Sequence, residues 1–320
     1  MTQHTVRFGV IGAGRIARNK VGPAIKSAES AILHAAASRD LARAESLGPV
    51  RAYGSYDDVI RDPDVDAVYI ATHNGLHRDL AISALQTGKH VLCEKPLAVN
   101  ARECKEIIDT AASADCHLVE AFMYRYHPQL AEVQGLVRAG AIGDLMVVEA
   151  SFRVPMRKAD DVRLRPEWGG GALLDVGCYC VNVSRLFLGD TPQRVQALAS
   201  FDAVHGVDTS VQGVLDYGSG RFAVISCGFD GGLHQTVALI GTGGVVSLNQ
   251  PFIPSKGEPR LTILRSDREE VIPLAHVNTY RSEIEDFALA VLNGSPPQLK
   301  PDEGFLNAQV LDRIAANISE

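Results

Sequence analysis

The first 122 residues alternate between two hydrophobic patterns, and this alternation limits the possible folds more than any other feature of the chain. Short apolar runs, typical of buried strands, occupy residues 5–12, 31–38, 66–72, 90–96 and 116–122. Stretches of helical period follow most of them, starting at Arg15 and at residues 40, 77 and 100. Strands that alternate with helices form βαβ units around a parallel sheet. Residues 1–122 are therefore predicted to form a doubly wound, Rossmann-type domain of the α/β class.

The pattern changes after Phe122. Helical stretches at 127–140 and after Gly171 are followed by β-branched runs of alternating character at 193–202, 209–217, 221–230, 234–241 and 244–252. The short links 216–221 and 241–244 are rich in glycine and are typical of antiparallel hairpins. Residues 123–320 are therefore predicted to form an α+β domain built on a large, mostly antiparallel sheet. The last helical stretch, 302–318, could pack back on the first domain.

Composition and charge exclude several classes of function. A chain of 320 residues with a formal net charge of −7 lacks the basic surface that nucleic acid or an anionic membrane requires. No apolar run reaches the roughly 18 residues of a membrane span, and the N-terminus lacks the pattern of a signal peptide. The six cysteines lack C-x-x-C spacing, which favours reduced core thiols over disulfides or a metal site. We expect a cytoplasmic protein that binds a small molecule and no metal.

A glycine-rich motif follows the first predicted strand. Gly12, Gly14 and Ala17 have the spacing G-x-G-x-x-A, and Arg15 and Ile16 lie inside it at the start of a helix. The first glycine permits a tight turn, the second lets a pyrophosphate approach the backbone, and the small third residue lets helix and strand pack closely. The N–H groups of the helix N-terminus attract the anion. In this context the motif predicts dinucleotide binding, although a glycine-rich turn without a ligand would look similar in isolation.

The end of the second strand bears on cofactor choice. NAD-binding folds usually carry Asp or Glu there, whereas this chain has Ser38 followed by Arg39. A hydroxyl and a guanidinium suit the 2′-phosphate of NADP, because the guanidinium makes charge-assisted hydrogen bonds. Ser38 could instead cap the next helix, with Arg39 as a solvated charge. The sequence therefore favours NADP, with NAD as the alternative.

Polar residues also follow the third and fourth of these strands. Thr72 is the last residue of the run 66–72, and Asn74 and His77 follow it. Glu94 and Lys95 lie at the end of the run 90–96, directly before Pro96. The carboxyl edge of an open α/β sheet is where ligands bind. We expect these residues to lie near the cofactor, although His77 could also cap the helix that it begins.

A polar stripe interrupts an apolar helix in the second domain. After the glycine run 169–171, Asp175, Tyr179 and Asn182 are spaced at i, i+4 and i+7 among residues that are otherwise apolar. Buried polar groups require partners or a function. Tyr179 could be a core residue hydrogen-bonded to its neighbours, or a group that takes part in chemistry.

Four motifs in order resemble the Gfo/Idh/MocA family of NAD(P)-dependent oxidoreductases: GAGRIA, CEKPLAVN, EAFMYRYHPQ and GGGALLDVGCYCVN. The residue types at two positions, Tyr179 and Asn182, resemble those of one branch of the family. This branch contains glucose-fructose oxidoreductase, D-xylose dehydrogenase and dihydrodiol dehydrogenase. The resemblance implies that residues 123–320 form an open-sheet domain for substrate binding and oligomerisation. It also implies catalysis by Lys95, Asp175 and Tyr179, with Tyr179 as the acid/base. One departure is His73, where many relatives have proline, which leaves a cofactor role for His73 open. Arg125, at the predicted domain junction, has no assigned role.

The expected activity is hydride transfer between NADP(H) and a carbon that bears a hydroxyl or carbonyl group, on a sugar, polyol or dihydrodiol. A cofactor-bound sensor of the same fold is the alternative, and a methyltransferase with a glycine-rich loop is disfavoured by the EKP motif. The apolar runs of the second sheet, together with the family resemblance, lead us to expect a homodimer or homotetramer.

Overall fold

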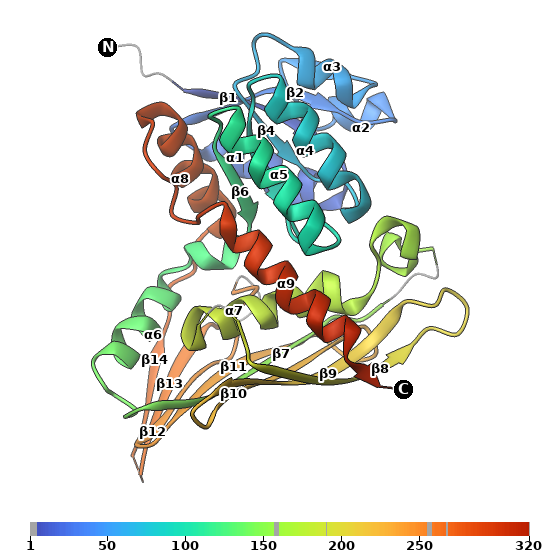
Figure 1. Cartoon of the computed structure of the whole chain (residues 1–320). Helices are drawn as coiled ribbons and strands as arrows, with labels where there is room; N and C mark the ends of the chain where they lie inside the picture. The colour runs from blue at the N-terminus through green and yellow to red at the C-terminus, as the bar shows by residue number, and fades with distance from the viewer. Residues whose placement is uncertain (1–4, 157–159, 190, 255–257, 267, 320) are drawn as a thin grey trace. The chain divides into compact units, whose positions relative to one another are not determined.

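The computed structural model describes residues 5–156, 160–189, 191–254, 258–266 and 268–319 (Figure 1). Its contacts divide the chain into two compact units. Unit 1 contains the chain up to Tyr126 together with Asn278–Phe305, and unit 2 contains His127–Val277 and the chain from Leu306 onward. The domain boundary expected after residue 122 stays a prediction.

Unit 1 contains a six-stranded, fully parallel sheet in the order β3-β2-β1-β4-β5-β6. Its strands are β1 Val6–Ile11, β2 Ala31–Ala37, β3 Arg51–Tyr53, β4 Ala67–Ile70, β5 His90–Glu94 and β6 Leu118–Ala121. The chain order reverses between β1 and β4, as in doubly wound sheets, which bind ligands at that point. The predicted Rossmann class is confirmed.

The helices of unit 1 include those predicted from Arg15 and from residues 40, 77 and 100. They are the π-helical turn Ala17–Val21, α1 Gly22–Ser27, α2 Leu41–Glu45, α3 Tyr56–Arg61, α4 His77–Gln86, α5 Ala101–Ser113 and α8 Thr279–Asn293. Strand β3 and helix α3 were not expected from the sequence, because elements of three and six residues are too short to show a period. Helix α8 follows the large sheet in the sequence but belongs to unit 1, where Phe287 packs on Phe8 of β1 with ring centroids 6.1 Å apart.

Unit 2 contains a nine-stranded sheet in the order β14-β13-β12-β11-β7-β10-β9-β8-β15. Its strands are β7 Leu145–Arg153, β8 Arg194–Phe201, β9 Asp208–Gly218, β10 Arg221–Gly228, β11 His234–Gly241, β12 Gly244–Leu248, β13 Arg260–Arg265, β14 Arg268–Pro273 and β15 Ile318–Ser319. The pairs β7–β10 and β8–β15 are parallel and the other pairs are antiparallel. The expected hairpins β9–β10 and β11–β12 are present, so the predicted mostly antiparallel sheet is confirmed.

One helical stretch of unit 2 lies against this sheet. Helix α7, Cys178–Leu188, is preceded by a π-helical turn, Leu173–Gly177, and packs on β7 and β10 (Figure 1). The stretch Pro166–Leu188 is long and apolar enough to cross a membrane, but 78% of its most apolar window is buried inside the protein. It therefore has the character of a core helix. Two further helices are α6, Pro128–Arg138, in unit 2, and α9, Asp302–Ala316, whose residues are divided between the units.

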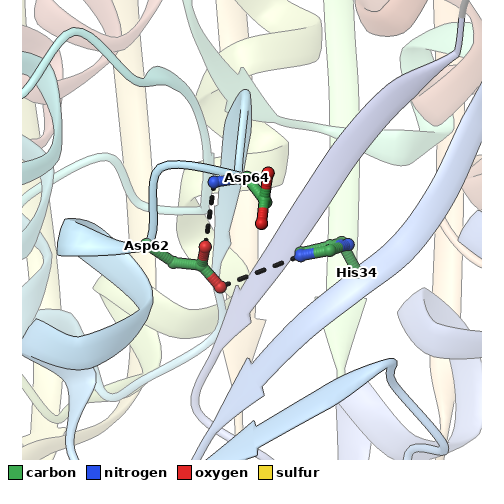
Figure 2. Close-up of side chains that lie close together, drawn as sticks. All are labelled: His34, Asp62 and Asp64. Carbon is green, nitrogen blue, oxygen red and sulfur yellow. Dashed lines mark hydrogen bonds and ion pairs between the residues drawn. The ribbon is translucent and has the colours of Figure 1, made fainter.

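A polar cluster in unit 1 brings His34, Asp62 and Asp64 together (Figure 2). Their possible ligand atoms lie within 4.8 Å of one another, which is close enough to suggest a metal site. However, Arg51 contacts Asp62 and Asp64 at 2.9 Å each, and Arg7 contacts Asp64 at 3.0 Å. The two guanidinium groups already neutralise these carboxylates, so the cluster is better explained as a set of ion pairs that joins β1, β2 and β3 to the segment before β4.

Candidate active site

The glycine motif forms a turn directly after β1. Gly12 has φ +96° and donates its N–H to Ala37 O at 2.9 Å, while a Cβ at this position would lie 2.8 Å from Ala71 O. Around Gly14, in contrast, the nearest atom to an added Cβ is 3.9 Å away. Ala17 is fully buried against the sheet. The loop is therefore tightly held on one side and open beside Gly14, which fits a pyrophosphate bound at the helix N-terminus.

The end of β2 presents one cation to solvent. Ser38 is buried, and its hydroxyl accepts a hydrogen bond from the N–H of Asp40 at 3.3 Å, which supports the turn after β2. It does not cap helix α2, because the N-cap position of that helix is Asp40, which makes no side-chain cap hydrogen bond. Asp40 pairs with Arg43 at 3.1 Å. Within the described residues no carboxylate pairs with Arg39, whose side chain is exposed. Arg39 is thus free to bind an anion, whereas Arg43 is already neutralised.

The segment that follows β5 is held by hydrogen bonds on both sides of Lys95. The hydroxyl of Tyr69 donates to Glu94 Oε1 at 2.8 Å, and the N–H of Leu97 donates to Glu120 Oε1 at 2.8 Å. Between these two contacts the Lys95–Pro96 peptide bond is cis. Sequence reasoning missed Tyr69 and Glu120. The only signal was a polar group inside an otherwise apolar strand, which requires a partner.

His77 makes a third contact with the segment after β5, and we call these three contacts, from Tyr69, Glu120 and His77, the clamp. Its Nδ1 lies 2.8 Å from Pro96 O and its Nε2 lies 3.3 Å from Thr72 O. Burial lowers the pKa of His77 to about 4, so the ring is neutral at physiological pH and carries one proton. A neutral ring can donate to one carbonyl only, and the shorter distance favours Pro96. His77 is fully buried and ties the β4 and β5 ends together.

The other predicted cofactor residues of unit 1 also lie beyond strand ends. Thr72 is half-buried just after β4, and Asn74 begins the 3-10 turn Asn74–Leu76. Arg15 is exposed and Ile16 is half-buried in the first helical turn after the glycine loop. The pairing of Ile11 with Ile70, and of Ile70 with Cys93, aligns the three strand ends. Unit 1 therefore gathers the predicted cofactor residues at one edge of its sheet.

Tyr179 of unit 2 lies in an aromatic cluster. Its ring centroid is 5.3 Å from that of Phe152 and 5.4 Å from that of Phe252, and those two rings stack at 5.1 Å. Phe152 comes from β7, so the sheet fixes the direction of the Tyr179 ring. The Phe152–Tyr179 pair is edge-to-face, and aromatic pairs of this kind contribute about 0.5–1.5 kcal/mol beyond the area that they bury. Asn182, one turn further along α7, is also buried.

Asp175 lies in the π-helical turn before α7 and pairs with an arginine that the sequence did not reveal. Arg163 Nη1 is 3.4 Å from Asp175 Oδ2, and Arg163 Nε is 2.9 Å from Asp161 Oδ1. The guanidinium also lies 5.3 Å from the centre of the Phe229 ring. The hydrogen bonds that Arg163 donates to Asp161, together with the charges of Asp175 and Asp161, raise the pKa of Arg163 despite its burial. Arg163 therefore holds the Asp175 carboxylate in one orientation.

Comparison with known proteins places this geometry in a class. Residues 6–122 match an oxidoreductase family with an NAD-binding Rossmann fold, and residues 130–247 match the GFO/IDH/MocA C-terminal domain. The chain is therefore an oxidoreductase. It belongs to the Gfo/Idh/MocA family, as its motifs indicated.

Several relatives extend over most of the chain. A D-xylose 1-dehydrogenase (NADP(+)) from Haloferax volcanii is 39% identical, over 96% of this chain and 95% of the relative. A trans-1,2-dihydrobenzene-1,2-diol dehydrogenase from Xenopus tropicalis is 36% identical, over 84% and 82%. The solved structure of a 3-ketoreductase from Actinomadura kijaniata, in complex with NADP and TDP-benzene, superposes with a TM-score of 0.94 at 30% identity over 98% of each chain. These similarities support a dehydrogenase or reductase that acts on hydroxyl or keto groups.

The buried, neutral His77 predicts a pH dependence of stability. Because its pKa is lowered to about 4 in the folded state, its contribution is complete above the unfolded value near 6.5 and is lost as the pH falls toward 4. His77→Gln keeps a donor for Pro96 O but cannot titrate. Between pH 7 and pH 4 the free energy of unfolding of the wild type should fall by up to about 3 kcal/mol more than that of the variant. Urea unfolding at several pH values measures this difference.

A histidine on the surface provides the control. His234→Gln changes an exposed residue at the start of β11 and should keep the wild-type pH dependence. If the His77→Gln and wild-type curves run parallel from pH 7 to pH 4, His77 is not a buried neutral group.

Proposed function

We propose that the protein is an NADP(H)-dependent oxidoreductase that exchanges hydride with a carbon bearing a hydroxyl or carbonyl group on a sugar, polyol or dihydrodiol. The observation that carries the cofactor choice is Arg39 just after β2, which is exposed and has no paired carboxylate among the residues that the structure describes. The substrate class rests on the relatives, which include dehydrogenases of D-xylose and of a dihydrodiol and a 3-ketoreductase.

A turnover screen of aldoses, inositols and dihydrodiols with NADP and with NAD tests this function. We expect turnover of at least one class, faster with NADP. A chain that turns over none of them with either cofactor would contradict the proposal and favour a cofactor-bound sensor.

The fit of NADP rests on groups that the chain supplies. The open side of Gly14 and the N–H groups of the following helix suit the pyrophosphate, and Arg39 suits the 2′-phosphate. The clamp on Glu94, Pro96 and Leu97 fixes the backbone of Lys95 at the same edge of the sheet. A bound nicotinamide would supply or accept the hydride. The protein must then move the proton of the substrate hydroxyl.

Tyr179 is the proposed acid/base. A free phenol has a pKa of about 10, which is too high for efficient proton exchange at neutral pH. A cation about 4 Å away at an effective dielectric constant near 20 contributes up to about 4 kcal/mol, or roughly three pKa units. The proposal therefore requires the Lys95 ammonium to meet the Tyr179 hydroxyl at the substrate. Asp175, oriented by Arg163, would accept a hydrogen bond from the substrate and fix its position.

The proposal also includes association of the protein with copies of itself. Leu198, Val214 and Val224, on the neighbouring strands β8, β9 and β10, are 61%, 44% and 40% exposed and alternate with buried residues. An open sheet face with this many exposed apolar side chains supports association into a homodimer or homotetramer. A cytoplasmic location stays a prediction.

Replacement of Arg39 tests the cofactor assignment. Arg39→Ala removes a charge-assisted hydrogen bond worth about 1.5–3 kcal/mol, which is about 10- to 100-fold in affinity. The dissociation constant for NADP should rise by that factor while the constant for NAD changes little, as measured by quenching of protein fluorescence. Arg43→Ala is the matched control, because Arg43 is already paired with Asp40. Equal losses for both cofactors would make Arg39 an ordinary surface charge.

Replacement of Tyr179 separates binding from chemistry. Tyr179→Phe keeps the ring contacts with Phe152 and Phe252, so the variant should fold and bind NADP normally. Loss of the acid/base group should lower kcat by roughly two to four orders of magnitude. Lys95→Ala should also lower kcat and should shift the basic limb of the pH–rate profile upward, because the phenol then lacks its cation.

The control for this series is Tyr53→Phe. It removes a hydroxyl that bonds Asp62 in unit 1 and should leave kcat unchanged. Near-normal turnover by Tyr179→Phe with every accepted substrate would exclude Tyr179 as the acid/base.

A further inference from the structure

The helical stretch that carries Asp175 and Tyr179 lacks a cap from its own sequence. Its first residue with helical geometry, Ala172, has no side-chain group that can accept a hydrogen bond. Helix N-termini leave several N–H groups without an intrahelical partner, and these groups need an acceptor when they are buried. Ala172 and Leu173 are both buried, so an acceptor must come from elsewhere in the fold.

Asp208 supplies that acceptor from the sheet. It is the first residue of β9, and its Oδ2 accepts the N–H of Leu173 at 2.6 Å. Asp208 is 35 residues away from Leu173 in the sequence, so the contact joins the large sheet to the start of the helix.

The glycine run makes room for this carboxylate. Gly171 has φ +108°, and a Cβ at this position would lie 2.2 Å from Asp208 Oδ1. A Cβ on Gly170 would lie 2.5 Å from Arg163 O, which also accepts the N–H of Gly171 at 2.9 Å. Two of the three glycines thus let the chain pass between the Asp208 carboxylate and the Arg163 backbone.

Asp175 is bonded to the same two parts of the chain, the glycine turn and Arg163. The N–H of Asp175 bonds Gly171 O at 3.2 Å, and its carboxylate pairs with Arg163 at 3.4 Å. The backbone of Asp175 therefore depends on the glycine turn that Asp208 fixes. Tyr179 follows one turn later on the same continuous helix, so any shift at residues 171–173 is transmitted to both side chains.

We propose that Asp208 is a positioning residue for the reaction: by accepting the N–H of Leu173 beside the glycine turn, it sets the orientation in which Asp175 and Tyr179 meet the substrate. The inference rests on the proposed function for its catalytic consequence, whereas the anchoring of the helix start is independent of it.

The environment of Asp208 acts on its ionisation in two opposite ways. Burial raises the pKa of its carboxyl, whereas the hydrogen bond from the N–H of Leu173 favours the ionised form. A raised folded-state pKa means that the stabilising contribution of the carboxyl is complete below the unfolded value near 4 and is lost as the pH rises through the folded value.

The test compares Asp208→Asn with Asp216→Asn. Asn at 208 keeps the size and one acceptor oxygen but places an NH₂ group against backbone donors. Asp216 lies on the same strand, bonds Arg194 and the N–H of Gly218, and has no contact with the helix start within the described residues, which makes it a matched control. Asp208→Ala is the stronger variant, and Asp208→Asn is the milder one if Asp208→Ala fails to fold.

Two readouts decide the outcome. Hydrogen exchange followed by mass spectrometry should show the peptide 171–180 exchanging about fivefold faster or more in Asp208→Asn and unchanged in Asp216→Asn. With the sugar that the wild type turns over fastest, kcat should fall about 10- to 100-fold, while KM for NADP and the melting temperature stay near wild type. Asp216→Asn should lower the melting temperature and leave kcat unchanged.

Two results would contradict the proposed role of Asp208. Unchanged exchange in the peptide 171–180 would show that Asp208 does not anchor the helix start. Faster exchange with normal kcat would make Asp208 a structural cap only and would overturn the positioning role. A wild-type protein without turnover of any screened sugar would contradict the proposed function instead, and the exchange experiment would still decide the anchoring.

Discussion

Three hydrogen bonds around Lys95 hold the part of unit 1 on which the proposed chemistry depends. Lysine has a long, flexible side chain, so its ammonium can act at a defined point only if its backbone is fixed. The contacts of Tyr69 with Glu94, of His77 with Pro96 and of Glu120 with Leu97 do this from strands β4 and β6 and from helix α4. All three supporting side chains are fully or largely buried. The site therefore rests on groups that never need to touch the substrate.

In unit 2, a different set of contacts holds the proposed catalytic side chains Asp175 and Tyr179 in place. Arg163 binds the side chain of Asp175, Asp208 binds the backbone two residues before it, and Phe152 and Phe252 hold the ring of Tyr179. Apart from Arg163, these supports come from strands of the large sheet or from the segment between β12 and β13. A sheet of nine strands is a rigid support, and functional groups built on rigid elements are held more accurately than groups on loops. The π-helical turn Leu173–Gly177 adds a local widening of the kind often found at functional sites.

The sequence predicted the parts of this arrangement that have local signals. The glycine spacing at Gly12 and Gly14, the strand–helix rhythm and the polar stripe at Asp175 and Tyr179 are short-range patterns, and the fold class follows from them. Strand β7, at the centre of the large sheet, was not predicted, and the π-helical turn could not be, because residues that form α-helices also form π-turns. Asp208, Arg163 and Glu120 act across 12 to 35 residues of sequence. One sequence contains no pattern that pairs such positions.

A crystal structure of the protein with NADP and a sugar that it turns over would show the proposed catalytic groups directly. We expect the Tyr179 hydroxyl and the Lys95 ammonium both to lie within hydrogen-bond reach, about 2.6–3.2 Å, of the reacting hydroxyl or of each other. We also expect Arg39 to contact the 2′-phosphate. A complex in which the reacting carbon lies beside other titratable groups, with Tyr179 still enclosed between Phe152 and Phe252 and out of reach, would contradict the assignment of Tyr179 as the acid/base.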